Sequence, residues 1–528
     1  MRIYRLSRWT ALAATVASLL ALAACGDGGE PVDVDATVVA AVSATVEARN
    51  TPDGEEPSTG DPSAVPVNLE TEASVSESNP LIVEVRIRTD IAAQVYVEYE
   101  NGDAGRFRTA TAASAKEHVV PVVRLRPDTG YSYDAFALGP GGKLSEVSSG
   151  TFETGKLPEA LATIEHSTEG SSTSELLLLD YEDVLGSYIY ALDSDANIVW
   201  YYASPNLVAD QPYAINAVRQ QDDYNLVYYM GRNRRPCCIR EITPLGEIVD
   251  NLSYGDIDGL PHHDQLLLAD REVMYLARIY KEIDDSANGG EERVLVEGDS
   301  IRIWERKTGT SREVWNAFDM FSTDVRLTWE TVPFYGVPGQ PEREGEIIRW
   351  WNANSLQIGP RGNYVLSVKT LDQVISISPD LQHVEWVFGG PNGVYKFATP
   401  DDRFYLPHTA SELSNGNILL FDNGQGRPED EGGEYTRVVE FSLSEYDLAA
   451  TKVWEYRPSP DLFSRTRGGA YRLNNGNTLV NFNTTPRVVT EVDRDGEELW
   501  RLEAWSPAYK GSYRAYSLSS IMGETKQE

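Results

Sequence analysis

The chain has 528 residues and a formal net charge of −35, and 10% of its residues are aromatic. So large an excess of acidic groups argues against nucleic acid or an anionic membrane surface as a partner. The length allows a large core and more than one domain, and the many Tyr and Trp residues favour an all-β protein.

The first 24 residues have the features of an export signal. Three arginines within the first eight residues precede an apolar stretch at 11–21, which is too short to span a membrane as a helix. Residues 22–26 read LAACG, which resembles a bacterial lipobox, where cleavage precedes a lipid-carrying cysteine. We therefore expect 1–24 to be a lipoprotein signal peptide and lipidated Cys25 to anchor the protein in a bacterial envelope, on the periplasmic or cell surface. The alternative is a plain secretory signal with a chance cysteine.

Two stretches separate this signal from the rest of the chain. Residues 25–66 are rich in Ala, Asp, Glu, Pro, Ser and Thr without an apolar period, which indicates a disordered tether. Residues 67–157 contain alternating apolar runs at 81–88, 93–99 and 118–123, which predict strands with one buried face. The segment LRPDTGY at 125–131 resembles the "L-x-P-x-T-x-Y" turn of fibronectin type III domains. We predict a small fibronectin-III/Ig-like β-sandwich at 67–157.

Residues 158–528 contain a repeat with a long period. Each unit closes with an alternating strand, usually with a Trp after an acidic or Gly turn, at 197–200, 246–249, 312–315, 383–386, 451–454 and 497–500. A spacing of roughly 45 to 70 residues, with about four strands per unit, suits propeller blades with insertions. A solenoid fits less well, because four-stranded units need radial closure to hide their edges. We predict a six-bladed β-propeller at 158–528, closed by a strand near 513–518.

The first strand of each propeller blade lines the central channel, so polar residues that open the repeats are candidates for a site. Three of the six histidines stand at such openings: His262 and His263 in one repeat, and His408 in another. Other repeat openings and the ends of the following strands add Arg278, Asn352, Asn354 and Lys369. Polar groups at matching places in several blades predict a polar funnel at one mouth of the ring.

The two remaining cysteines, Cys237 and Cys238, are adjacent. In an oxidising compartment they can form a vicinal disulfide, pair between molecules or stay as thiols. Two neighbouring cysteines without further Cys or His ligands nearby make a poor zinc site, so we expect no metal there.

Several motifs resemble the arylsulfate sulfotransferase family, bacterial enzymes that need no nucleotide sulfate donor. The similarity covers about 67–528, and its most specific parts are HHD at 262–264, WWNANS at 350–355, His408 with LFDNGQGR at 420–427, and RGGAYRLNNGNTL at 467–479. The resemblance implies a sandwich followed by a six-bladed propeller, and sulfuryl transfer without a metal or another cofactor.

The family resemblance also implies roles for single residues. In the family a histidine before the "FDNG" strand attacks the sulfur and is transiently sulfated, and this residue matches His408. The histidine of the HHD motif matches His263. The chain departs from the pattern where Asn352 replaces a third histidine and Lys369 replaces an arginine. Lysine keeps the charge without the two-pronged fork of arginine, and asparagine carries neither charge nor an acidic proton.

The leading hypothesis is an arylsulfotransferase-type enzyme that moves a sulfuryl group from a phenolic sulfate donor to a phenol acceptor through a sulfohistidine. His408 would be the nucleophile, because a neutral imidazole can attack sulfur. His263 and Lys369 would stabilise the sulfuryl oxygens and Asn352 would help to position them. The residues expected to bind substrate are Asn354, Arg278 and His262. His262 has the alternative role of orienting His263.

Two other functions are compatible with the pattern. A non-catalytic surface propeller would use the same funnel to bind an anionic or glycan ligand, and the departures at 352 and 369 favour this alternative. A quinoprotein dehydrogenase fits less well, because only the propeller suggests it. The chain would act as a monomer or as a homodimer, and it would contact the membrane through its lipid. The sequence leaves the identities of donor and acceptor open.

Overall fold

The computed structural model describes residues 67–142, 144–145, 147–182, 186–204, 214–232, 235–253, 259–288, 290–327, 330–337, 340–507 and 513–527. The predicted signal peptide, Cys25 and the tether at 25–66 lie outside these ranges. Within them, no helix is long and apolar enough to cross a membrane. The helices are short: α3 (Glu159–Ala162), α4 (Ala317–Met320) and several single 3-10 turns, of which η6 (Lys369–Leu371) matters for the site.

The N-terminal domain is a β-sandwich organised by one long strand, β2 (Val83–Asn101). Strands β1 (Leu69–Val75) and β4 (Ala112–Val122) pair with its first part, and β3 (Gly105–Arg108) and β5 (Gly130–Leu138) pair with its second part. Strand β6 (Ser148–Glu153) pairs with β5. Alternate side chains of β2 are buried, as the sequence pattern predicts. The Arg126 N–H donates to the Tyr131 hydroxyl at 2.8 Å, which fixes the predicted turn at 125–131.

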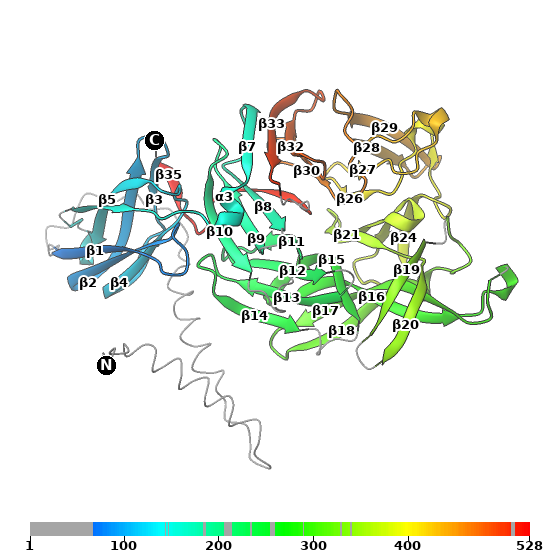
Figure 1. Cartoon of the computed structure of the whole chain (residues 1–528), viewed down its shortest axis with the longest axis horizontal. Coiled ribbons are helices and arrows are strands. Elements are labelled where there is room, and N and C mark those ends of the chain that lie inside the picture. The colour runs from blue at the N-terminus through cyan, green and yellow to red at the C-terminus, as the bar shows by residue number, and fades with distance from the viewer. Residues whose placement is uncertain are drawn as a thin grey trace, which may run out of the picture. The chain divides into compact units, whose positions relative to one another are not determined.

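Six sheets follow one another around a ring, which confirms the predicted six-bladed propeller (Figure 1). The first blade contains β8 (Leu176–Glu182), β9 (Ser187–Leu192) and β10 (Ile198–Ser204). The second contains β11 (Ala214–Gln220), β12 (Leu226–Arg232), β13 (Arg235–Ile242) and β14 (Ile248–Ser253). The third contains β15 (Leu260–Leu267), β16 (Val273–Ile283), β17 (Val294–Glu305) and β18 (Thr310–Asn316). The fourth contains β21 (Ala353–Ile358), β22 (Tyr364–Val368), β23 (Gln373–Ile377) and β24 (Val384–Gly389). The fifth contains β26 (His408–Glu412), β27 (Ile418–Asp422), β28 (Arg437–Ser444) and β29 (Ala449–Tyr456). The sixth contains β30 (Gly469–Arg472), β31 (Thr478–Phe482), β32 (Arg487–Val492) and β33 (Glu498–Trp505).

Two additions enlarge the blades. A hairpin of β19 (Glu330–Val337) and β20 (Gln340–Arg349) joins the third blade, because β20 pairs in parallel with β17. The short strand β25 (Lys396–Phe397) pairs in parallel with β29 of the fifth blade. Apolar side chains of neighbouring sheets pack between the blades in continuous clusters, and this packing holds the ring together.

Both ends of the propeller sequence close the ring. Strand β34 (Ala515–Leu518) pairs with β8 and is the inner strand of the first blade, which confirms the predicted closing strand. Strand β7 (Glu165–Gly170) pairs with β33 as the outer strand of the last blade. We did not anticipate β7, because its sequence, EHSTEG, is polar throughout. Main-chain hydrogen bonds therefore hold one end of the propeller sequence in the first blade and the other end in the last blade.

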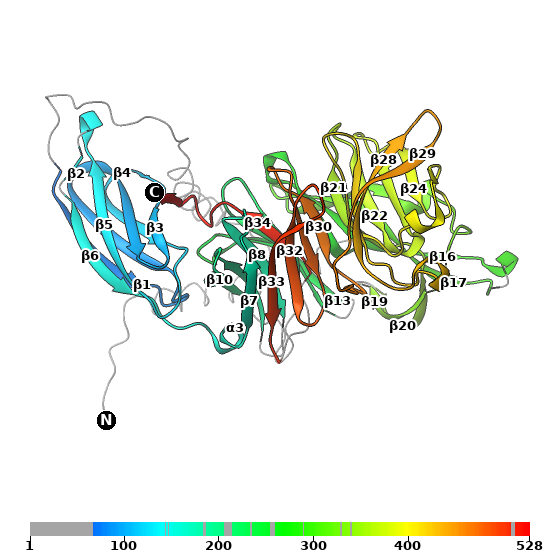
Figure 2. The ribbon, with the colours of Figure 1, turned by 90° about the horizontal axis from the view of Figure 1, so that it is seen from above.

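The end of the chain corrects one predicted boundary. We assigned all of 158–528 to the propeller, but β35 (Thr525–Gln527) pairs with β3 of the sandwich (Figure 2). The three residues of β35 carry no apolar alternation, so the sequence pattern could not assign them to a sheet. The sandwich domain therefore contains residues from both ends of the described chain.

Candidate functional site

Local irregularities place the functional side chains on the inner strands. In four blades the register of the inner strand against its neighbour shifts near its start, at Asn216/Arg219, Pro261/Gln265, Ala353/Ser355 and His408/Ser411. A bulge of this kind re-aims a side chain. His263 and Thr409 have the left-handed backbone there, with φ of 52° and 42°, a conformation that costs roughly 1–3 kcal/mol outside glycine. The Thr409 hydroxyl oxygen accepts a hydrogen bond from the Ala470 N–H at 3.0 Å, which stabilises the strained turn after His408.

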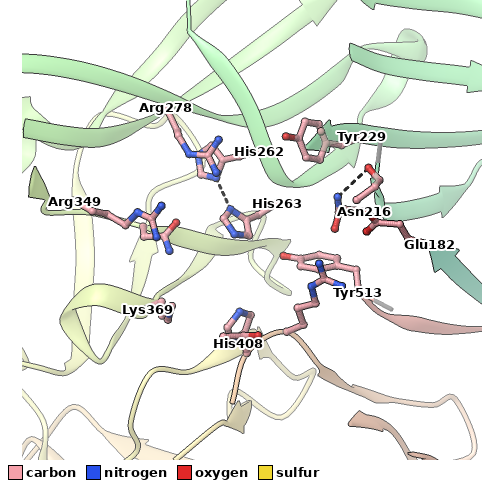
Figure 3. A pocket seen from close by; sticks show the side chains of 15 residues that line it. Glu182, Asn216, Tyr229, His262, His263, Arg278, Arg349, Lys369, His408 and Tyr513 are labelled. Carbon is pink, nitrogen blue, oxygen red and sulfur yellow. Dashed lines mark hydrogen bonds between the residues drawn. The ribbon is translucent and has the colours of Figure 1, made fainter. Parts of the chain in front are cut away.

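The polar openings of the blades meet in one cavity of about 470 Å³ (Figure 3). Six of the seven residues predicted for the site line it: His262, His263, Arg278, Asn352, Lys369 and His408. Figure 3 shows the rings of His263 and His408 on the same cavity, with Lys369 on one side and Tyr513 on the other. Residues 263 and 408 are far apart in the sequence, so the ring closure brings them together.

Asn354 is the predicted site residue that the structure does not place in the cavity lining. It is fully buried, and its side-chain amide donates to the Pro407 carbonyl at 2.7 Å. Its own carbonyl accepts hydrogen bonds from the Tyr513 hydroxyl at 3.0 Å and from Arg514 Nη2 at 2.6 Å. Asn354 therefore supports the backbone before His408 and the C-terminal segment. The prediction that it contacts substrate is corrected to this supporting position.

Asn423 determines which nitrogen of His408 faces the cavity. The amide nitrogen of Asn423 donates to the carbonyls of Ser464 and Arg467 at 2.6 and 3.0 Å, so its oxygen points the other way. That oxygen lies 2.6 Å from His408 Nδ1, which must donate the hydrogen bond. In the neutral ring Nε2 then carries the lone pair, as a nucleophile requires.

His408 is neutral throughout the physiological range. Burial lowers its pKa to about 3, and the nearby ammonium group of Lys369 adds to this effect. The hydrogen bond to Asn423 acts in the opposite direction and is outweighed. The ring is thus a neutral imidazole beside positive charges, rather than an imidazolium.

Four cationic side chains line the cavity: Arg278, Arg349, Lys369 and Arg467. Arg278 Nε lies 3.8 Å from Glu297 Oε1, and Arg349 Nε donates to the same oxygen at 3.0 Å. The buried Nε and Nη1 of Arg278 have no hydrogen-bond partner among the described residues. Among the described residues that line the cavity, one carries a carboxylate, Glu182. The mouth therefore has an excess of positive charge and donors, within a protein of net charge −35, and it suits an anion.

The two departures from the family pattern are neighbours in the structure. The Lys369 N–H, at the start of η6, donates to the Asn352 carbonyl at 2.9 Å. Both side chains line the cavity. A replacement at one position thus changes the surroundings of the other, so the pair should be altered together.

Asp372 directly follows η6 and carries a titratable carboxyl group. Its Oδ1 accepts a hydrogen bond from the Leu406 N–H at 2.6 Å, two residues before His408. Burial raises the pKa of Asp372 to about 7, even though the Leu406 hydrogen bond and Lys369 favour the charged form. Below this pH the carboxyl is mostly neutral and balances less of the Lys369 charge.

Arg349 and Tyr513 are among the cavity residues that sequence reasoning missed. Arg349 lines the cavity, and its only sequence signal is its place directly before the WWNANS motif. Tyr513, which we expected only in a closing strand, also lines the cavity, with its ring centroid 6.1 Å from that of His263. Both lie in parts of the chain that no repeat pattern marked as an opening.

Cys238 is disulfide-bonded, and the side chain of Cys237 lies outside the description. Among the described residues, no group of three or more His, Cys, Asp or Glu side chains is arranged to hold a metal ion.

Residues 161–510 match the family model described as Arylsulfotransferase (ASST), which is well over half of the chain. No curated protein matches the sequence.

Solved structures are similar only at a low level. A protein of unknown function from Bacteroides caccae has 12% identity and a TM-score of 0.36, covering 65% of this chain and 98% of its own. A protein from Lactobacillus plantarum has 12% identity and a TM-score of 0.34, with 63% and 83% coverage. Virginiamycin B lyase from Staphylococcus aureus has 10% identity and a TM-score of 0.31, with 83% and 99% coverage. These scores are too low to bear on the fold or the activity of this chain.

Proposed function

Because this chain belongs to the arylsulfotransferase family, we propose that it moves a sulfuryl group from a phenolic sulfate ester to a phenol through a sulfohistidine at His408. His408 Nε2 attacks the sulfur, the bond from sulfur to the aryl oxygen breaks, and the aryl oxygen leaves with the electron pair. In the second half a base in the cavity takes the proton of the acceptor phenol, the phenol oxygen bonds to the sulfur, and the electron pair of the N–S bond returns to Nε2. Each half-reaction has one covalent step, so the kinetics are ping-pong.

One observation carries this proposal: a neutral imidazole with a fixed tautomer faces a cavity rich in cations. The contact between His408 Nδ1 and Asn423 Oδ1 leaves Nε2 as the nucleophile. Sulfuryl transfer resembles loose phosphoryl transfer, in which positioning and electrostatic stabilisation dominate. The presence of Arg278 and Lys369 in the cavity lining supports this proposal, because such cations can stabilise the sulfuryl oxygens, and Arg349 adds a second guanidinium.

The direct test is to search for the covalent intermediate. The protein is incubated with 4-nitrophenyl sulfate in the absence of an acceptor, digested rapidly and analysed by mass spectrometry. We expect an added sulfuryl group on the peptide that contains His408, and its loss after phenol is added. A sulfuryl group on another residue, or none at all while nitrophenol is released, would contradict the proposed nucleophile.

The departures at 352 and 369 supply a second prediction. We expect the double variant Asn352→His/Lys369→Arg to turn over aryl sulfates about 10²-fold faster, because it regains a general acid and a bidentate donor. The measurement is the steady-state rate with 4-nitrophenyl sulfate and phenol. Lys116→Arg, on the exposed face of the sandwich, is the matched control.

The same experiment separates the enzyme from the non-catalytic alternative. Strong activity that the double variant does not improve would mean that Arg278 and Arg349 have taken over the lost contacts. If neither protein turns over and neither forms a sulfohistidine, while both bind aryl sulfate, the surface propeller that binds an anionic or glycan ligand is the better description. The departures themselves favour that alternative.

We also propose that the protein is a lipid-anchored enzyme of the bacterial envelope. The LAACG segment supports this location, since a lipobox cysteine receives diacylglycerol. The variant Cys25→Ser is expected to lose metabolic labelling by a fatty-acid probe and to move from the membrane fraction to the soluble fraction. Membrane association of this variant equal to that of the wild type would contradict the anchor.

A further inference from the structure

Two histidine rings meet at one edge of the cavity. His262 Nδ1 and His263 Nδ1 lie 2.6 Å apart (Figure 3), so one nitrogen carries a hydrogen and the other accepts it. On the far side of His262, its Nε2 lies 3.2 Å from Asp299 Oδ1. The other oxygen of Asp299 accepts a hydrogen bond from the Ala353 N–H at 2.5 Å, which holds the carboxylate in place. The three side chains form a row from a buried carboxylate to the cavity.

The surrounding charges decide where an added proton resides in this row. Burial is the main cause that lowers the pKa of His263 well below its usual value, and the neighbouring His262, Arg278, His408 and Arg514 act in the same direction. His262, in contrast, lies against the carboxylate of Asp299, and an opposite charge at this distance favours the protonated ring. A proton that enters the row is therefore held on His262 rather than on His263.

We propose that Asp299, His262 and His263 form a proton relay for sulfuryl transfer, in which His263 is the catalytic acid and base. His262 and Asp299 act through His263 and are positioning residues. This inference rests on the proposed function. It gives His262, the first histidine of the HHD motif, a role in the reaction.

The proton transfers balance over the two half-reactions. With His262 protonated, its Nδ1–H donates to His263 Nδ1, and His263 presents Nε2–H to the cavity. As His408 Nε2 bonds to the sulfur and the aryl oxygen departs, that oxygen takes the Nε2 proton of His263, whose Nδ1 takes a proton from His262. The donor thus leaves as a neutral phenol. The acceptor phenol then returns its proton to His263 Nε2, and His263 passes a proton back to His262.

Other charged and titratable groups face the row from the surrounding elements. They are Glu182 on β8, Tyr229 on β12, Arg278 on β16, Glu297 on β17, Arg349 on β20, Lys369 on η6, His408 on β26, and Tyr513 and Arg514 before β34. His408 has a pKa of about 3, so it does not titrate in the neutral range. Asp372, next to η6 and Lys369, has a pKa of about 7, so only a limb of the pH profile that is absent in His262→Gln is assigned to the relay.

The test compares two donors whose leaving phenols differ in acidity. Phenyl sulfate needs a proton on its departing oxygen, whereas 4-nitrophenyl sulfate leaves readily as the phenolate. We expect His262→Gln to lower kcat/KM by about 10²–10⁴-fold for phenyl sulfate and by less than about tenfold for 4-nitrophenyl sulfate. Asp299→Asn is expected to show the same selectivity with a smaller loss. His383→Gln, at an exposed histidine, is the matched control and should leave both rates unchanged.

The pH profile separates a relay from a structural role. In the wild type, kcat/KM for phenyl sulfate should fall as pH rises and His262 loses its proton, and this limb should be absent in His262→Gln. A loss that is equal for both donors, with an unchanged pH profile, would overturn the relay. If the variants do not fold, the wild type still decides: a solvent deuterium isotope effect should accompany phenyl sulfate but not 4-nitrophenyl sulfate, and its absence would also overturn the relay.

The failure of the relay and the failure of the proposed function can be distinguished. If wild type and His262→Gln both form sulfo-His408 from 4-nitrophenyl sulfate but show no donor selectivity, only the relay is wrong. If the wild type forms no sulfohistidine from either donor, the proposed function itself is wrong.

Discussion

His408→Ala is expected to lower kcat/KM for 4-nitrophenyl sulfate at least about 10³-fold, since the variant lacks the atom that bonds to sulfur. The remaining cations can still bind the sulfate ester, so KM should change much less than kcat. The release of nitrophenolate with phenol as the acceptor measures this effect. A burst in the first turnover, expected for the wild type when transfer to the acceptor is slow, should disappear.

Two controls test whether a loss of activity in His408→Ala comes from the missing nucleophile. His383→Ala removes an exposed histidine, 65% accessible, and should behave as the wild type. His408→Gly tests for rescue, because imidazole added to the solution can enter the space and serve as the nucleophile. If His408→Ala and the wild type release nitrophenolate at the same rate, His408 is not the nucleophile and the enzyme proposal is wrong.

The second large effect concerns stability. Asp264→Ala is expected to lower the free energy of unfolding by about 3–5 kcal/mol, since it leaves buried arginines without a counter-charge. Asp264 Oδ1 accepts from Arg219 Nη2 at 3.0 Å, and Oδ2 lies 2.8 Å from Arg514 Nη1. Oδ2 also accepts from the Leu356 N–H at 3.0 Å. One carboxylate therefore ties the second and fourth blades to the C-terminal segment at the axis.

Denaturant unfolding with and without acid tests this account. Burial favours the neutral form of Asp264, but Arg219 and Arg514 outweigh burial and hold its pKa below its usual value. The stabilisation is thus present above the unfolded pKa of 3.8 and is lost as pH falls through the lower folded value. The difference between wild type and Asp264→Ala should shrink in strong acid. Asp430→Ala, at an exposed aspartate, should change stability by less than about 0.5 kcal/mol.

The local sequence pattern was sufficient to predict the propeller architecture. Alternation with a period of two marks the strands, and the recurring Trp-bearing strands mark six blades, because these patterns reflect which faces are buried within a single sheet. The openings of the repeats also marked His263 and His408 correctly as cavity residues, because equivalent positions in a propeller point to the same axis. The alternation depends only on neighbours within one blade.

The contacts between blades and at the chain ends could be identified only from the tertiary structure. Strands β7 and β35 carry no apolar alternation and gain their partners solely through the closure of sheets. Asn352 and Asn354 stand two positions apart in one motif, and the strand register shifts between Ala353 and Ser355. Asn352 lines the cavity, whereas the Asn354 amide is buried and supports the backbone at Pro407. The row of Asp299, His262 and His263 joins two strands of one blade through side chains whose spacing no sequence period encodes. The sequence determines which residues face the axis. The distances among them depend on how the sheets pack, because that packing results from many weak contacts distributed over the whole ring.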